Sequence, residues 1–66
     1  MTNIDKEFIT LTQFLKMKDL ISSGGEAKYF LKEKKVKVNG ILEDRRGRKL
    51  FKDDEVYVEG KYYKID

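Results

Sequence analysis

The chain has 66 residues, 39% of them hydrophobic and 41% charged, with fifteen Lys and Arg against twelve Asp and Glu for a net charge of +3. A chain this short buries only about 60% of the surface that its unfolded form exposes, which excludes a second domain and a deep substrate pocket. It contains no Cys and no His, which excludes disulfides, thiolate metal sites and the commonest general base of enzymes.

The chain begins with a polar tail and a short helix. Residues 1–9 show no clear hydrophobic period, which predicts a tail or a short strand at Phe8-Ile9. A helix is indicated next by three apolar residues at helical spacing: Leu11, Phe14 and Leu15. The hydroxyl of Thr10 or Thr12 can cap this helix, which is expected to end near Lys18.

A second helix is expected to start after Ser23. The run Ser23-Gly24-Gly25-Glu26 fits a capping box, in which the serine hydroxyl accepts the N–H of the glutamate and the carboxylate reaches back. Three apolar residues at helical spacing form the buried stripe of this helix: Ala27, Phe30 and Leu31. Lys28 and Lys32 lie along one edge of that stripe, and Lys35 joins them if the helix runs so far.

Tyr29 points almost opposite to the buried stripe, so its ring is expected to be exposed. An exposed tyrosine beside a row of lysines is suited to stack on a nucleic-acid base. The alternative is that the ring lies flat on neighbouring lysine stems and has no role in binding.

After residue 35 the hydrophobic period changes to two. Val36 and Val38 alternate with Lys37, and the following Asn39-Gly40 predicts a tight hairpin, because a type I′ turn requires positive φ at both central positions. Further strands are expected at four apolar or alternating segments: 41–42, 50–51, 56–58 and 62–65. The rest of the chain is therefore expected to form an antiparallel sheet.

Features typical of catalytic and metal sites are weak. Gly24-Gly25 precedes a helix but lacks the other residues of a phosphate-binding loop, so at most one phosphate would lie on the free N–H groups there. Glu43-Asp44 and residues 53–55 are carboxylate clusters on turns, which we expect to be solvated. With no His to activate a serine, we expect no catalysis, no metal and no cofactor.

The positive charge is concentrated in the middle of the chain. Residues 28–52 hold ten basic and three acidic residues, a balance of +7, whereas the remainder holds five basic and nine acidic ones, a balance of −4. Such segregation favours a polyanionic partner, although a solvated lysine-rich surface would give the same pattern.

The run Arg45-Arg46-Gly47-Arg48-Lys49 contains four cations in five positions and all three arginines of the chain. The guanidinium fork matches phosphate oxygens and stacks on bases, so this loop is a candidate binding site. The alternative is a mobile loop whose charge only aids solubility. If the loop lies near Lys28, the two form one continuous patch.

These features together resemble the S4 RNA-binding domain family. The similarity consists of two short helices, a strand, a basic loop and a closing strand, and runs from about residue 10 to residue 58. Its most specific part is Val36-Lys37-Val38-Asn39-Gly40 with Ser23, Ala27 and Lys28 before it. The run Ser23-Gly24-Gly25-Glu26-Ala27-Lys28 and the basic loop are similar to those of the very small YaaA-type S4 proteins of bacteria. Two positions depart from the family pattern: Gly24 stands where many S4 domains have Arg, and Asp53 stands where Gly commonly precedes the last core strand.

The resemblance implies an α+β chain with the S4-like α-L fold: two to three short helices packed on a small bent antiparallel sheet, over residues 10–66. It also implies an RNA-binding surface on the second helix, the first strand and the basic loop. With the residues singled out above, the candidate surface comprises Ser23, Gly24, Gly25, Lys28, Tyr29, Lys32, Lys35, Lys37, Arg45, Arg46, Arg48 and Lys49. Replacing the three arginines with Ala is expected to weaken binding and to leave stability nearly unchanged.

The resulting functional hypothesis is a non-enzymatic RNA-binding module without catalytic residues or cofactor. By resemblance its target is ribosomal RNA or a ribosomal particle; DNA binding, or binding of an acidic protein through the same patch, are the alternatives. No apolar run approaches the roughly 20 residues of a membrane span and no signal peptide is recognisable, so a cytoplasmic protein without membrane or small-molecule ligands is expected. The oligomeric state stays open; the exposed strand edges could pair between chains under Tyr57, Tyr62 and Tyr63, although these tyrosines are expected to be half-buried strand residues.

Overall fold

A computed structural model describes residues 7–66 of the chain, so most of the tail expected at 1–9 lies outside the described residues. In chain order the elements are β1 (Phe8–Thr10), α1 (Leu11–Met17), α2 (Gly24–Lys34), β2 (Lys37–Val38), β3 (Ile41–Leu42), β4 (Lys49–Phe51), β5 (Glu55–Val58) and β6 (Lys61–Lys64). The helices and strands were expected in this order.

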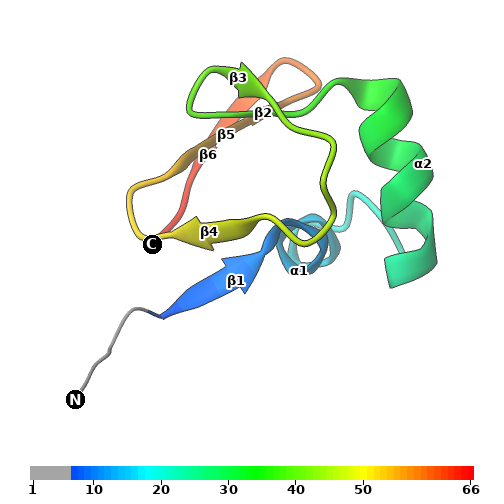
Figure 1. Ribbon diagram of the computed structural model, residues 1–66, viewed down its shortest axis with the longest axis horizontal. Helices are drawn as coiled ribbons and strands as arrows, with labels where there is room; N and C mark the ends of the chain where they lie inside the picture. Colours follow the sequence, from blue (N-terminus) through cyan, green and yellow to red (C-terminus); the bar gives the residue numbers. More distant parts are fainter. Residues whose placement is uncertain (1–6) are drawn as a thin grey trace.

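All strand pairs are antiparallel, and they form two sheets. One sheet has four strands in the order β3-β2-β5-β6, and the other consists of β1 and β4, in which Ile9 lies opposite Leu50. Figure 1 shows the β1–β4 pair next to α1, the four-stranded sheet across the top of the molecule, and α2 closing one side. The α+β class expected from the sequence is confirmed, and the expected bent sheet is divided into these two.

The hydrophobic core lies between the helices and the two sheets. In β5, Val56 and Val58 point into the core while Tyr57 between them points to the opposite face, as the two-residue period of a strand requires. The remaining buried hydrophobic residues come from every layer: Leu11, Phe14, Leu15, Ile21, Ala27, Leu31, Val36, Val38 and Leu50. Tyr63 of β6 closes the core edge-on to Phe14, with the ring centroids 5.4 Å apart.

Local hydrogen bonds define both ends of α1. Thr10 and Gln13 form a reciprocal capping box at its start, which settles the choice of cap in favour of Thr10. At its end Asp19 adopts a left-handed φ of 59°, and the N–H groups of Asp19 and Leu20 donate to the carbonyls of Lys16 and Leu15. This is the Schellman pattern, which usually has Gly in place of Asp19.

The expectation that α2 begins with a capping box is wrong. Ser23 is the N-cap, but its hydroxyl makes no capping hydrogen bond; its backbone carbonyl accepts the N–H of Glu26 instead. The Glu26 carboxylate accepts from the N–H of Ser22, one residue before the expected partner, at 2.8 Å. The negative charge of Glu26 still lies at the positive end of the helix dipole, where it is favourable.

Two tight hairpins hold the four-stranded sheet together. Asn39 and Gly40 both have positive φ, 53° and 85°, which confirms the predicted type I′ turn between β2 and β3. Glu59 and Gly60 repeat the pattern between β5 and β6, with φ of 50° and 81°. In the turn after β4, Asp53 has φ of 75°, so it occupies a conformation that favours Gly.

Candidate nucleic-acid interface

The basic connection between β3 and β4, residues 43–48, is attached to the first turn of α1. The backbone N–H of Leu11 donates to the carbonyl of Arg48 at 2.8 Å, and the N–H and hydroxyl of Thr12 both donate to the carbonyl of Arg46, at 3.1 and 3.0 Å. These bonds satisfy N–H groups that the start of a helix leaves without intrahelical partners. The connection is therefore held in place on both sides of Gly47.

Glu43 is buried and binds two of the arginines in this connection. The expectation that its side chain is solvated is therefore wrong. Its side chain is only 6% exposed and accepts three side-chain hydrogen bonds, from Nε and Nη2 of Arg45 at 2.9 and 3.2 Å and from Nη1 of Arg48 at 2.8 Å. The backbone N–H of Arg45 donates to it as well, at 3.0 Å. A buried carboxylate requires such partners, because burial without them would cost several kcal/mol.

These contacts change the proton affinity of Glu43. The hydrogen bond from the Arg45 side chain is the largest influence; together with the bond from Arg48 it outweighs burial and lowers the pKa of Glu43 to about 2. The same contact raises the pKa of Arg45. Glu43 is therefore ionised throughout the physiological range and holds two of the three arginines in fixed orientations.

The three arginines are consequently not equivalent. Arg45 and Arg48 are bound to Glu43, with side chains 72% and 31% exposed. Arg46 between them is exposed, and its guanidinium forms no hydrogen bond or ion pair with any residue from 7 to 66. Of the three, Arg46 has the largest number of free N–H donors.

A cleft of about 390 Å³ separates α2 from the start of this connection. One wall is formed by Lys28 and Lys32, on the expected edge of the helix, together with Lys35; the helix ends at Lys34, so Lys35 is its left-handed C-cap. The other wall is formed by Leu42, Glu43 and Asp44. In Figure 1 the chain after β3 passes alongside α2 before it reaches α1 and β4. The part of the connection that borders this cleft is acidic and includes none of the residues Arg45–Lys49, so the cleft does not join the basic loop and Lys28 into one continuous patch.

Two of the three arginines line a different hollow. Arg45, Arg48 and Lys49 border this space of about 560 Å³ together with Gly47, Phe51 and Asp54. The ammonium group of Lys49 lies 4.9 Å above the centre of the Phe8 ring, a cation–π contact. The connection thus borders both a lysine cleft and an arginine hollow, and we refer to residues 43–48 as the ridge.

The other predicted residues lie on α2 and on the four-stranded sheet. At the start of α2, Gly24 faces Thr12, whose side chain would lie 3.8 Å from a Cβ at this position, while Ser23 and Gly25 flank it. Tyr29 is 66% exposed, as expected from its position on the helix. Lys37 lies on the far face of the four-stranded sheet, away from the core.

A family model described as the S4 domain matches residues 2–66 of the chain. The chain belongs to the S4 domain family. It is also 57% identical over 58 residues to the "Probable ribosome maturation protein RlbA" of Bacillus subtilis (strain 168), which covers 88% of this chain and 82% of that protein. No solved structure gives a significant match.

The positions where this S4 domain departs from the family pattern have structural consequences. With Gly24 in place of Arg, the start of α2 presents no cation, and the nearest charged side chain on that turn is the acidic Glu26. The positive side chains begin one turn later, at Lys28. The cations of α2 therefore start at Lys28 and continue to its C-terminal end.

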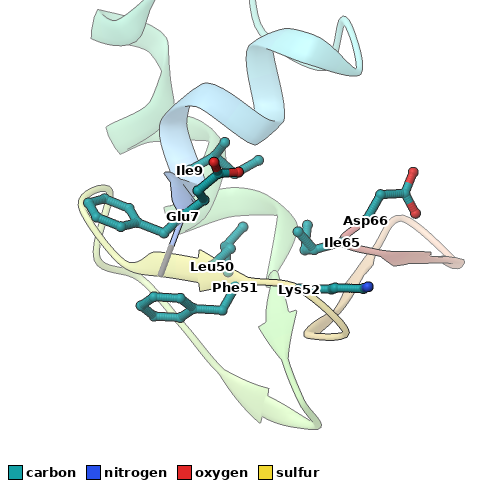
Figure 2. Close-up of a pocket in the computed structure, with 8 residues that line it drawn as sticks. Glu7, Ile9, Leu50, Phe51, Lys52, Ile65 and Asp66 are labelled. Carbon is teal, nitrogen blue, oxygen red and sulfur yellow. The ribbon is translucent and has the colours of Figure 1, made fainter. Parts of the chain in front are cut away.

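A further hollow, of about 590 Å³, borders the β1–β4 pair and the C-terminal residues (Figure 2). Ile9, Leu50 and Ile65 line it with Phe8 and Phe51, and Figure 2 shows Lys52 and Asp66 on the side of Ile65. Within residues 7–66 no group of three acidic side chains gathers in an arrangement that could hold a metal ion. No helix in this part of the chain is long and apolar enough to cross a membrane.

Proposed function

We propose that this S4 domain is a non-enzymatic module that binds structured RNA, and that its target is ribosomal RNA in a maturing ribosomal particle. The observation that carries the proposal is the cleft in which Lys28, Lys32 and Lys35 face the β3–β4 ridge. The name of the B. subtilis relative, a probable ribosome maturation protein, supports the choice of RNA and of target. A ribosomal target would place the action in the cytoplasm.

The lysines suit a nucleic-acid backbone. Lys28 and Lys32 occupy positions i and i+4 of α2, so they follow one side of the helix about 6 Å apart along its axis. Lys35 follows them as the left-handed C-cap residue of the helix. An RNA strand along this side would bring successive phosphates to them. Double-stranded RNA is recognised mainly by shape and by backbone contacts, which such a row of cations can supply without reading sequence.

The arginines would add hydrogen-bond donors for the phosphate oxygens of the RNA. Each guanidinium has five N–H donors, and Glu43 uses two of those on Arg45 and one on Arg48, so donors remain on both for phosphate oxygens. Since Glu43 already orders these side chains, little conformational entropy is lost when RNA binds. The guanidinium of Arg46, which has no partner among the described residues, would contact a phosphate or stack on a base.

Crosslinking in cells followed by sequencing of the attached RNA tests this proposal. The test variant is Lys28→Gln with Lys32→Gln, and the matched control is Lys16→Gln with Lys52→Gln, which removes the same charge from exposed positions outside the cleft. We expect enrichment of a ribosomal RNA site that the test variant loses and the control keeps. Equal enrichment with both variants would refute the role of the cleft.

Competition between RNA and DNA hairpins of the same sequence separates the remaining alternatives. We expect the RNA hairpin to displace a bound RNA probe at least tenfold more effectively than the DNA hairpin. Equal competition would indicate backbone binding to either nucleic acid. A failure of both hairpins to bind, with an acidic protein recovered through the same lysines, would indicate a protein-interaction module instead.

A further inference from the structure

The outer face of the four-stranded sheet has a row of side chains that the core does not use. The strand register aligns Leu42 of β3, Lys37 of β2, Tyr57 of β5 and Tyr62 of β6, one residue per strand, on the face opposite to the buried valines. The rings of Tyr57 and Tyr62 lie 4.7 Å apart. We refer to these four residues as the tyrosine row.

Tyr62 is the most accessible member of this row with an aromatic ring. It is 70% exposed, so the expectation of a half-buried strand residue is wrong for Tyr62. Tyr63, the next residue, points to the core and packs on Phe14. Because side chains alternate between the two faces of a strand, Tyr63 contributes to the core while the ring of Tyr62 stays accessible to a ligand.

The two tyrosines on the outer face border a hollow, and the lysines of this face outnumber its one glutamate. A depression of about 350 Å³ is lined by Tyr57, Tyr62 and Lys37 together with Gly40 and Glu55. Lys64 lies directly opposite Glu55 in the register, so the face has two lysines and one glutamate. Aromatic rings beside cations form the combination that binds unpaired nucleotides, because bases stack on the rings while the cations neutralise the phosphates.

The tyrosine row is continuous with the lysine cleft. Leu42 is the cross-strand neighbour of Lys37 and also lines the cleft beside Lys32 and Lys35. A chain that leaves the cleft over Leu42 would reach Lys37 next and then the tyrosines. The two surfaces can therefore hold successive parts of one ligand.

A second copy of the protein fits this face poorly. If β6 paired antiparallel with β6 of another copy, Lys61 of one would lie near Lys64 of the other, and like charges at opposed positions are destabilising. A row of four residues is also far smaller than the roughly 20 to 30 residues that each partner contributes to a stable interface. Charge and size both favour a polyanion over a dimer.

We propose that the tyrosine row binds an unpaired RNA segment next to the structured part held in the cleft, with bases stacked on Tyr62 and Tyr57 and a phosphate on Lys37. This inference rests on the proposed function and extends it, since the preferred ligand becomes a junction between a helix and a single strand. Such stacking accepts any base, because each base has a π face.

Fluorescence anisotropy with three RNA probes tests the inference. The probes are a blunt hairpin, the same hairpin with a six-adenosine extension at either end, and the same hairpin with an abasic extension carrying equal phosphates. We expect an adenosine extension at one end to strengthen binding about five- to thirtyfold over the abasic one, as one stacked base or more would do. Tyr62→Val should remove this gain and leave the affinity for the blunt hairpin unchanged, while Tyr62→Phe should keep it.

Ile41→Thr is the matched control, because Ile41 is as exposed as Tyr62 but belongs to the opposite face of the sheet. Equal affinities for the adenosine and abasic probes would overturn the inference and leave the proposed function intact. Failure to bind the blunt hairpin would instead contradict the proposed function. A dimer in sedimentation velocity that Tyr62→Val dissociates would assign the row to a second copy and would also overturn the inference.

Discussion

The Nη1 atom of Arg48 lies 2.8 Å from Oε1 of the buried Glu43, and the backbone carbonyl of the same arginine accepts the N–H of Leu11 at the start of α1. Arg48 thus joins a buried carboxylate to the first turn of a helix through two atoms of one residue. The basic ridge is consequently part of the folded structure as well as a candidate binding surface. This double role determines which substitutions test binding and which test stability.

Glu43→Gln is expected to make stability less dependent on acid pH. The pKa of Glu43 falls from its ordinary value of 4.5 to about 2 in the folded protein. Its ionised form therefore stabilises the fold fully at pH values above the ordinary pKa. This contribution, about 1–2 kcal/mol because solvent screens the exposed Arg45, is lost as the pH falls from about 5 to 2. Urea unfolding at pH 2, 4 and 7 measures it.

The wild type and Glu43→Gln should differ most at pH 7 and converge near pH 2. Asp44→Asn is the control, because Asp44 is an adjacent exposed carboxylate that makes no hydrogen bond to the ridge arginines. A constant difference between wild type and Glu43→Gln across this range would mean that the charge of Glu43 does not contribute.

Arg48→Ala should mainly lower stability, whereas Arg46→Ala should mainly weaken RNA binding. Removing Arg48 takes one partner from a buried carboxylate, which costs about 1–3 kcal/mol and lowers the melting temperature by roughly 5–15 °C. Removing Arg46 should leave the melting temperature within about 2 °C and weaken RNA binding about three- to tenfold. Thermal melts and anisotropy titrations on the same samples measure both.

From the sequence alone, all three arginines were expected to be replaceable with Ala with nearly unchanged stability. The structure argues against that for Arg48, and for Arg45 to a lesser degree since solvent screens its ion pair. Equal melting temperatures for Arg48→Ala and wild type would show that Glu43 finds another partner.

RNA binding should weaken steeply with salt. If about four to six phosphates are neutralised, the logarithm of the affinity should fall with the logarithm of the salt concentration at a slope of roughly −3 to −5. Replacing both Lys28 and Lys32 with Gln should make this slope shallower by about 2. Titrations between 50 and 300 mM KCl, chosen as an order-of-magnitude range around physiological salt, measure the slope, and a flat response would exclude electrostatic binding.

Asp53→Gly should stabilise the protein. Asp53 has φ of 75°, a conformation that costs L residues about 1–2 kcal/mol and costs Gly nothing, so the gain should be about 0.5–1 kcal/mol after the larger entropy of an unfolded Gly is subtracted. Asp54→Ala is the comparison, because the Asp54 carboxylate accepts from the N–H of Phe51 and from Asn39. Its loss should cost about 1 kcal/mol in urea unfolding, and a destabilising Asp53→Gly would contradict this account of the turn.

Much of the architecture could be predicted because its signals are local. The Asn39-Gly40 turn follows from the φ angles that these residues tolerate, and the exposure of Tyr29 follows from the 100° step of a helix. The lysine edge of α2 has the same origin. In each case the residues that decide the outcome lie within about four positions of one another.

Glu43 and Tyr62 could not be predicted in the same way. Glu43 stands in a polar run that is typical of solvated turns, and its burial depends on β3 pairing with β2 and on a ridge attached to α1. Two adjacent tyrosines in β6 look alike in sequence, and only the register with β5 puts Tyr63 on the core and Tyr62 on the outer face. A shift of one residue would exchange them.

The sequence by itself determined the order of helices and strands, the turns between them and the positive middle of the chain, since these depend on residue type and short spacing. The tertiary structure alone decided that two arginines are held by one carboxylate, that the lysines of α2 share a cleft with the start of the ridge, and that Leu42, Lys37, Tyr57 and Tyr62 form one row. The physical reason is that these relationships join residues from separate elements, and no local pattern specifies how such elements are placed against one another.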